Sequence, residues 1–203
     1  PLAATFNTSA VVNCLTVAQD GRLFVGGNFT AVAGLTRGGL AAFLTNGSIQ
    51  NWAPICDGTV YALSISGNTL YVGGAFTNIM STSRSNLAAV DATTGDILTW
   101  NPPPSDGSVR TILVSGNLIY VGGAFSYLGG FQRSQLAAIT QEGLVTAWDP
   151  SANGLVMTLA EKDGKIYAGG QFISMRVFPR QHLACLDTVS GSPTSWNPSS
   201  DQP

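Results

Sequence analysis

The feature that most constrains this chain is an internal repeat of about 48 residues, which occurs four times in 203 residues. Each copy carries a Gly-Gly-x-Phe motif, an arginine eight residues after the Phe, and a closing Trp. The shared residues are Gly26, Gly27, Phe29, Gly73, Gly74, Phe76, Gly122, Gly123, Phe125, Gly169, Gly170 and Phe172, then Arg37, Arg84, Arg133 and Arg180, then Trp52, Trp100, Trp148 and Trp196. Such self-similarity predicts a tandem array in which each unit buries its apolar face against the next.

Within one repeat the apolar residues recur with the period of a β-strand. In the second repeat, residues 60–65 alternate, Gly67-Asn68 forms a turn, and residues 70–72 begin a second β-rich run. Two such runs joined by residues that tolerate positive φ predict a hairpin. Residues 87–91 predict a third strand and residues 97–100 a fourth, and no stretch has the pattern of an amphipathic helix.

The predicted fold is therefore all-β: a β-propeller built from four four-stranded antiparallel blades. We expect a single domain over residues 1–203, with blades at about 9–54, 55–104, 105–152 and 153–198. The doubled glycine is expected to let the second strand approach neighbouring backbone closely. The motif Phe and the Trp of each repeat are expected to pack between successive blades.

These motifs resemble those of the bacterial delta-60 repeat propellers and, more distantly, the repeats of fungal cortical-marker proteins. The resemblance rests on residues 20–29, Arg37 and residues 46–52, and it extends over almost the whole chain. Kelch repeats share the double-glycine blade, but the Arg and Leu-Ala that follow here are not the kelch pattern. The resemblance implies a secreted or surface-displayed propeller, often embedded in a large adhesion or envelope protein, and it implies no conserved catalytic set.

The number of blades in the closed ring is left open by the sequence. Four blades either close a small ring or form an arc, in which case two chains give eight blades and three give twelve. Phe6-Asn7 resembles the end of another fourth strand, so residues 1–8 are expected to come from a preceding segment. The chain opens at Pro1, which indicates a mature product or a piece of something longer. We expect a homo-oligomer, because charged residues are scarce here and interface cores are depleted of charge.

Composition excludes several classes of function. Only 10% of the residues are charged and the net charge is −2, which offers no footprint for nucleic acid, and no apolar run is long enough for membrane insertion. No ligand cluster indicates a metal, and no cofactor is expected.

The one histidine, His182, occupies the position of Gly39, Asn86 and Gln135, which indicates a residue at a strand start and no enzyme. The three cysteines are interpreted as small buried thiols, with a Cys14–Cys56 bridge as the alternative.

Binding is expected where the repeat varies, in the segment between the motif Phe and the Arg. These segments keep their length and carry apolar side chains where a solvent loop would be polar. The candidate binding residues are Met80, Tyr127, Leu128, Phe131, Met175, Arg176 and Phe178. Loops on a rigid scaffold are common binding sites, so these residues predict a recognition surface or a subunit contact; the alternative is that they fold back on the blade.

The repeated arginines and tryptophans are interpreted as structural. The alternatives are a ring of positive charges for an anion and aromatic faces for a sugar. The sequence thus predicts a non-catalytic recognition or adhesion module at the cell surface or outside the cell. It would bind a glycan or a cell-envelope component and form part of a larger adhesin or fibre. The alternatives are a structural spacer whose loops only contact sister subunits and, least favoured, a hydrolase or lyase.

Overall fold

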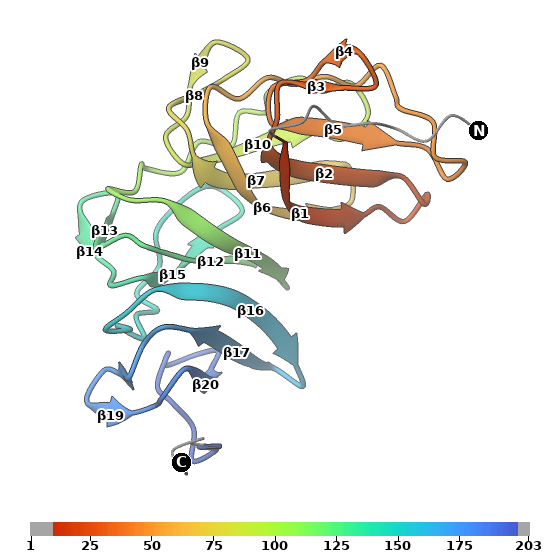
Figure 1. Cartoon of the computed structure of the whole chain (residues 1–203). Coiled ribbons are helices and arrows are strands. Elements are labelled where there is room, and N and C mark those ends of the chain that lie inside the picture. The colour runs from red at the N-terminus through yellow and green to blue at the C-terminus, as the bar shows by residue number, and fades with distance from the viewer. Residues whose placement is uncertain (1–9, 199–203) are drawn as a thin grey trace. The chain divides into compact units, whose positions relative to one another are not determined.

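The structure, a computed structural model, describes residues 10–198, and its regular elements are all β-strands (Figure 1). The chain forms two compact units, residues 1–101 and 102–203, and each contains two repeats. No helix in the described part of the chain is long and apolar enough to cross a membrane. Residues 1–8, including Phe6-Asn7, lie outside the described residues.

In the first unit each repeat forms one three-stranded antiparallel sheet. The first sheet has the order β1-β2-β5, and the second has the order β10-β7-β6. The strands are β1 (Val11–Val17), β2 (Leu23–Asn28), β5 (Leu40–Phe43), β6 (Thr59–Ser66), β7 (Thr69–Ala75) and β10 (Leu87–Asp91). A short hairpin follows the second strand of each sheet: β3 (Ala31–Val32) with β4 (Leu35–Thr36), and β8 (Asn78–Ile79) with β9 (Thr82–Ser83).

The second unit has the same construction. Its sheets have the orders β11-β12-β15 and β16-β17-β20. The strands are β11 (Val109–Ser115), β12 (Leu118–Gly123), β15 (Leu136–Thr140), β16 (Val156–Lys162), β17 (Lys165–Gly170) and β20 (Leu183–Asp187). The hairpins are β13 (Tyr127–Leu128) with β14 (Phe131–Gln132), and β18 (Ser174–Met175) with β19 (Phe178–Pro179).

The expected fourth strand is not a full strand. Each repeat's fourth segment makes a single bridge to the third strand: Phe43–Ile49, Val90–Ile97, Ile139–Val145 and Leu186–Pro193. Next to this bridge the repeat's arginine donates to a carbonyl oxygen of the fourth segment. In the first repeat the Arg37 Nη2 donates to the Gln50 carbonyl oxygen, 2.7 Å away. The four-stranded sheets predicted from the sequence are therefore three-stranded sheets with a one-bridge extension.

The doubled glycines have the close approach that the sequence predicts. A Cβ on the second glycine would lie 2.2 Å from the Thr59 carbonyl oxygen at Gly74 and 2.1 Å from that of Ser108 at Gly123. The first strand has a register shift at this point, for example between Val60 and Ala62, which brings its backbone over the glycine. Only a residue without a side chain allows two strands to come this close.

Three of the four tryptophans are buried, and two of them tie one repeat to the next within a unit. Trp52 is 3% exposed and its indole N–H donates to the Asp91 carbonyl oxygen at 3.0 Å. Trp148 is 4% exposed and donates to the Asp187 carbonyl oxygen at 2.9 Å. Trp196 differs, because 42% of its surface is exposed. The prediction that all four tryptophans pack between repeats is therefore wrong for Trp196.

Candidate binding surface on the hairpin loops

The variable segment of each repeat folds as a hairpin of two two-residue strands, and in the second, third and fourth repeats this hairpin is held at its base. In the second repeat the Asp57 carboxylate accepts hydrogen bonds from the backbone N–H groups of Thr77 and Asn78, at 2.8 and 2.9 Å, and from both side chains. Desolvation raises the pKa of Asp57, but these four hydrogen bonds favour the charged form more strongly and hold its pKa well below the usual range.

The third and fourth repeats use the same anchor. Asp106 accepts from the N–H groups of Ser126 and Tyr127, and the Asn153 Oδ1 accepts from those of Ile173 and Ser174. Because a neutral Asn performs the task in the fourth repeat, the anchor requires an acceptor oxygen at this place but does not require a charge in every repeat.

One residue of each hairpin points inward, and this corrects two of the predicted surface residues. Leu128 and Met175 are fully buried, as are their counterparts Val32 and Ile79 in the first two repeats. The backbone of Leu128 forms a β-bridge with Ser105, and that of Met175 forms one with Ala152. The linker that enters the third and the fourth repeat therefore lies beside these two residues. A signal was present in the sequence, because the third residue after the motif Phe is apolar in all four repeats.

The other apolar candidates are exposed. Met80, Tyr127, Phe131 and Phe178 are each roughly half-exposed, and the neighbouring Val177 is almost fully exposed. Phe131 has the Arg133 guanidinium over its ring, 5.7 Å from the centroid. The sequence did not single out Leu35, which is exposed at the equivalent position of the first repeat.

The fourth repeat's hairpin also borders a cavity of about 490 Å³, whose lining includes Ile173, Val177, Pro179 and Gln181. Arg176 contributes to this lining, but its guanidinium is already engaged. It donates to the carbonyl oxygens of Asp149 and Ser190, both at 2.9 Å, and to the Ser192 Oγ at 3.1 Å. Arg176 therefore fixes the hairpin against the end of the third repeat and a turn of its own repeat, and the lining of the cavity is mainly apolar.

The hairpin tips contain backbone conformations that side chains rarely adopt. Met80 and Ser81 have φ of 50° and 60°, and Arg176 has φ of 51°. The third repeat has Gly129 and Gly130 at the corresponding turn, where the same conformation costs nothing. A left-handed residue with a side chain costs about 1–2 kcal/mol, and such strain gathers at functional loops.

The repeated arginines bind backbone within their own repeats. Each Nη1 donates to the carbonyl oxygen of the preceding residue, and each Nη2 donates to a carbonyl oxygen of the fourth segment. Arg37 and Arg180 are buried. These contacts are those of structural donors, which the sequence predicted.

His182 and the three cysteines are the other reactive side chains that the sequence analysis considered. His182 has φ of 65°, close to the 66° and 65° of Asn86 and Gln135, so it holds the same backbone position at the start of the third strand. No group of three or more His, Cys, Asp or Glu in residues 10–198 could hold a metal. Cys14, Cys56 and Cys185 are free thiols, and burial raises the pKa of Cys14 and Cys56 to about 12. Their thiolates are therefore scarce at neutral pH.

Comparisons with known proteins support β-propeller repeat character. The family described as "Domain of unknown function (DUF5122) beta-propeller" matches residues 18–49, which is part of the first repeat. No curated protein matches the chain. Among solved structures, the computationally designed Ika4 protein is similar at 13% identity and a TM-score of 0.58, over 82% of this chain and 90% of that one.

Two further structures are similar over parts of their length. A chain from an analysis of two prolyl endopeptidases matches at 17% identity and a TM-score of 0.55, over 91% of this chain and 26% of that one. The computationally designed Ika8 protein matches at 14% identity and a TM-score of 0.49, over 90% of this chain and 60% of that one. At these identities the likeness concerns the fold alone.

Proposed function

We propose that this chain is a non-catalytic recognition module, displayed outside the cell, whose four repeats are blades of a delta-60 type β-propeller. Its hairpin tips bind a glycan or another cell-envelope component. The observation that carries the proposal is the set of exposed aromatic side chains on the anchored hairpins of the third and fourth repeats: Tyr127, Phe131 and Phe178. Aromatic and apolar side chains gathered on a surface are characteristic of interaction sites.

The anchors support binding because they reduce its entropic cost. Tyr127 receives its position from the Asp106 carboxylate at 2.9 Å, and the β18–β19 hairpin from Asn153 and Arg176. A loop whose backbone is held before the ligand arrives loses little freedom on binding. Each ring then offers a flat apolar face of the kind that stacks on the C–H face of a sugar, and several weak contacts add up when many copies are displayed together.

The test is binding of the purified chain to a glycan array and to isolated envelope polysaccharide. The chain itself supplies the substitutions, because Thr82 stands in the second repeat where the third and fourth repeats have Phe131 and Phe178. We expect Phe131→Thr and Phe178→Thr to weaken binding at least tenfold, and Leu35→Thr, the matched change in the first repeat, to leave it unchanged. Folded variants that bind as tightly as the parent would remove the basis for the proposal.

The second candidate function is a structural or assembly domain. It is favoured by the exposed apolar side chains of β1, among them Leu15 and Val17, which lie outside the hairpins. If the hairpin variants bind normally and the protein self-associates, this function takes the place of recognition. A hydrolysis screen with His182→Ala as the control tests the least favoured alternative, an enzyme.

A further inference from the structure

Each unit contains a repeat-to-repeat junction with the same construction. In the first unit, Phe24, Leu40 and Trp52 of the first repeat form one apolar cluster with side chains of the second repeat that include Val60, Leu70 and Val90. Trp52 lies against the turn after β10, where a Cβ on Gly95 would be 3.4 Å from its ring. We call the Trp-bearing side of a repeat the donor face and the side that receives the Trp the acceptor face.

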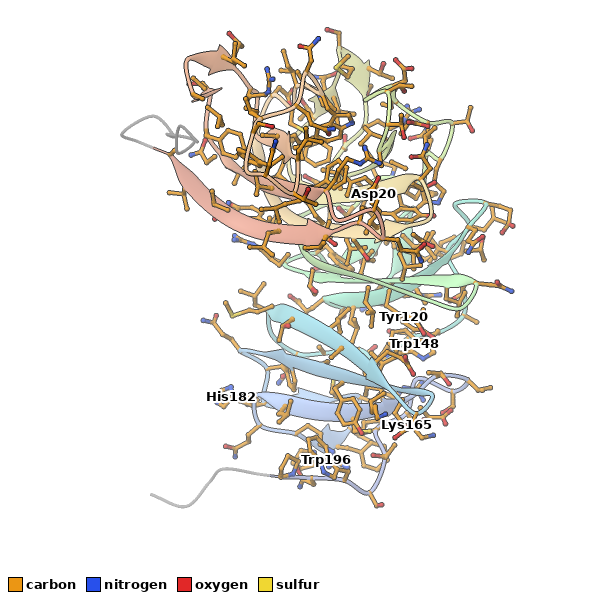
Figure 2. All side chains as sticks on the ribbon, turned by 90° about the vertical axis from the view of Figure 1, so that its right-hand side faces the viewer. Asp20, Tyr120, Trp148, Lys165, His182 and Trp196 are labelled. Atoms are coloured by element: carbon orange, nitrogen blue, oxygen red, sulfur yellow. The ribbon has the colours of Figure 1, made fainter. Side chains whose placement is uncertain are left out.

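The second unit has the same junction at the corresponding positions. The donor face of the third repeat consists of Tyr120, Leu136 and Trp148. The acceptor face of the fourth repeat contributes Val156, Ile166 and Leu186 to the same apolar cluster. A Cβ on Gly191 would lie 3.4 Å from the Trp148 ring. Figure 2 shows Tyr120 and Trp148 side by side, with ring centroids 4.9 Å apart and planes at 77°. In both copies of the junction the acceptor face therefore consists of three apolar side chains and a turn glycine that lies against the tryptophan ring.

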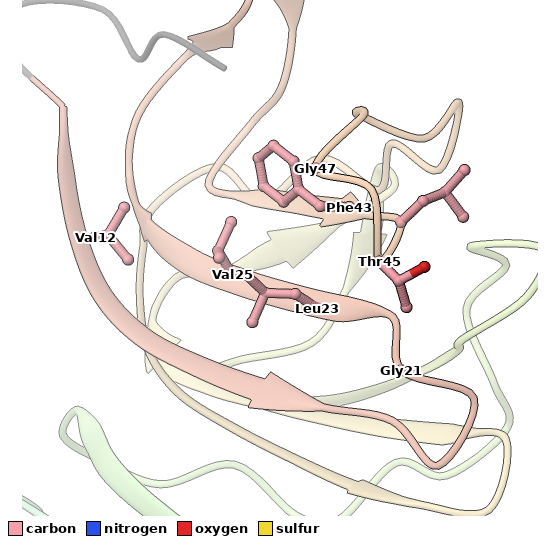
Figure 3. Close-up of a pocket in the computed structure, with 8 residues that line it drawn as sticks. Val12, Gly21, Leu23, Val25, Phe43, Thr45 and Gly47 are labelled. Carbon is pink, nitrogen blue, oxygen red and sulfur yellow. The ribbon is translucent and has the colours of Figure 1, made fainter. Parts of the chain in front are cut away.

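The first repeat has an acceptor face of its own, and a cavity lies over it. Val12, Leu23 and Phe43 correspond in register to Val60, Leu70 and Val90. Together with Val25 and Gly47 they line an open, mainly apolar cavity of about 500 Å³ (Figure 3). A Cβ on Gly47 would meet no heavy atom within 4 Å among the described residues, unlike one on Gly95.

The hydrogen-bond acceptor for an incoming indole is also in place. The carbonyl oxygen of Leu44 stands where Asp91 and Asp187 receive the indole N–H groups. In each turn the glycine N–H donates to this carbonyl oxygen: Gly47 to Leu44 at 2.9 Å and Gly95 to Asp91 at 2.9 Å, although the turn of the first repeat is one residue shorter. A carbonyl oxygen accepts two hydrogen bonds, so Leu44 retains capacity for one more.

The fourth repeat has a donor face that is exposed. Trp196 packs edge-on against Tyr167, with centroids 5.4 Å apart, as Trp148 does against Tyr120. Trp196 is nevertheless 42% exposed and Leu183 is 39% exposed, whereas their counterparts Trp148 and Leu136 are buried at 4% and 0%. Figure 2 shows Trp196 on the last repeat of the chain. The Trp196–Tyr167 pair therefore has the geometry of a donor face, but its apolar surface is exposed. The cavity of the first repeat is an apolar acceptor face that no tryptophan among the described residues fills.

We propose that the Trp196 face of one copy of this chain docks into the Gly47 cavity of a second copy. The contact is head to tail: Trp196 fills the cavity over Val12, Leu23 and Phe43, and its indole N–H donates to the Leu44 carbonyl oxygen. Such a heterologous contact repeats until it closes. Two copies, each giving one face to the other, contribute eight repeats, which lies within the range of about four to eight blades in known propellers.

The first test is the mass in solution as a function of concentration, by sedimentation or light scattering. We expect the parent chain to reach twice its 21.0 kDa mass. Trp196→Ala and Val12→Glu are each expected to weaken self-association at least tenfold, because one removes the inserted ring and the other places a charge in the apolar cavity. The matched controls are Val189→Ala, an exposed change in the same repeat, and Val17→Glu, an exposed change on the same strand outside the cavity lining.

A mixing experiment tests the head-to-tail geometry. Trp196→Ala retains the cavity and Val12→Glu retains the tryptophan, so an equimolar mixture is expected to form a dimer with one intact contact although each variant alone is a monomer. A parent chain that stays at 21.0 kDa at every concentration, or a dimer that Trp196→Ala leaves intact, overturns the proposal. If Phe6→Ala weakens self-association and Trp196→Ala does not, the proposal is overturned as well, because the cavity is then occupied by the chain's own first residues.

Discussion

Replacing Trp148 with alanine tests the idea that the tryptophans hold one repeat to the next. Trp148 is 4% exposed, and a buried aromatic side chain removes about 150–250 Å² from water, worth roughly 4–6 kcal/mol. Alanine retains part of this, so Trp148→Ala is expected to lower the free energy of unfolding by about 3–5 kcal/mol. Loss of the 2.9 Å bond to the Asp187 carbonyl oxygen is included in that cost.

The matched control is the same substitution at Trp196, which occupies the same position in the next repeat. Because 42% of Trp196 is already exposed, we expect Trp196→Ala to cost about 1–2 kcal/mol in a single copy of the chain. Trp148→Phe separates the two contributions: it retains an aromatic ring and loses the indole N–H, whose hydrogen bond contributes about 1 kcal/mol.

The assay is urea unfolding followed by circular dichroism, at a protein concentration low enough that copies do not associate. Thermal unfolding gives a second readout, at about 2–4 °C per kcal/mol for a chain of this size. Equal losses for Trp148→Ala and Trp196→Ala would refute the reasoning, because Trp148 is 4% exposed and Trp196 is 42% exposed. An unchanged unfolding midpoint for Trp148→Ala would refute it directly.

Three further predictions concern the local geometry. Gly74→Ala should cost at least about 1–3 kcal/mol by urea unfolding, because its Cβ would lie 2.2 Å from the Thr59 carbonyl oxygen; an unchanged midpoint would show that the strands separate easily. Met80→Gly should stabilise the chain by about 0.5–1 kcal/mol, because it relieves a φ of 50° that costs more than the added chain entropy of glycine; a lower urea midpoint would contradict this. The folded-state pKa of Asp57 is depressed, so its contribution to stability is present above the ordinary value of 3.8 and is lost as the pH falls toward the lower, folded-state value. Acid titration of stability should therefore show a smaller drop in Asp57→Asn than in the parent, and identical curves would mean that the anchor does not depend on ionisation.

The hairpins show which features of the candidate surface can be predicted from the sequence and which cannot. The exposure of Tyr127, Phe131 and Phe178 was expected from their place in a variable loop, and the structure places all three at the surface. Leu128 and Met175 lie in the same loops but point inward, because a linker nearly 25 residues earlier in the chain covers them. Loop membership alone does not give the direction of a side chain.

The sequence by itself determined the repeat, the hairpins and the role of the glycines, because each of these depends on local backbone chemistry. A turn such as Asp163-Gly164 needs positive φ, and Gly74 must lack a side chain where two strands come within contact of each other. The tertiary structure decided the rest. It reduced the fourth strand to a single bridge beside the arginine contact, and it left Trp196 exposed while it buried Trp148. Identical residues at identical repeat positions differ here because burial depends on which surface lies opposite, and that is a property of packing between repeats that no single repeat contains.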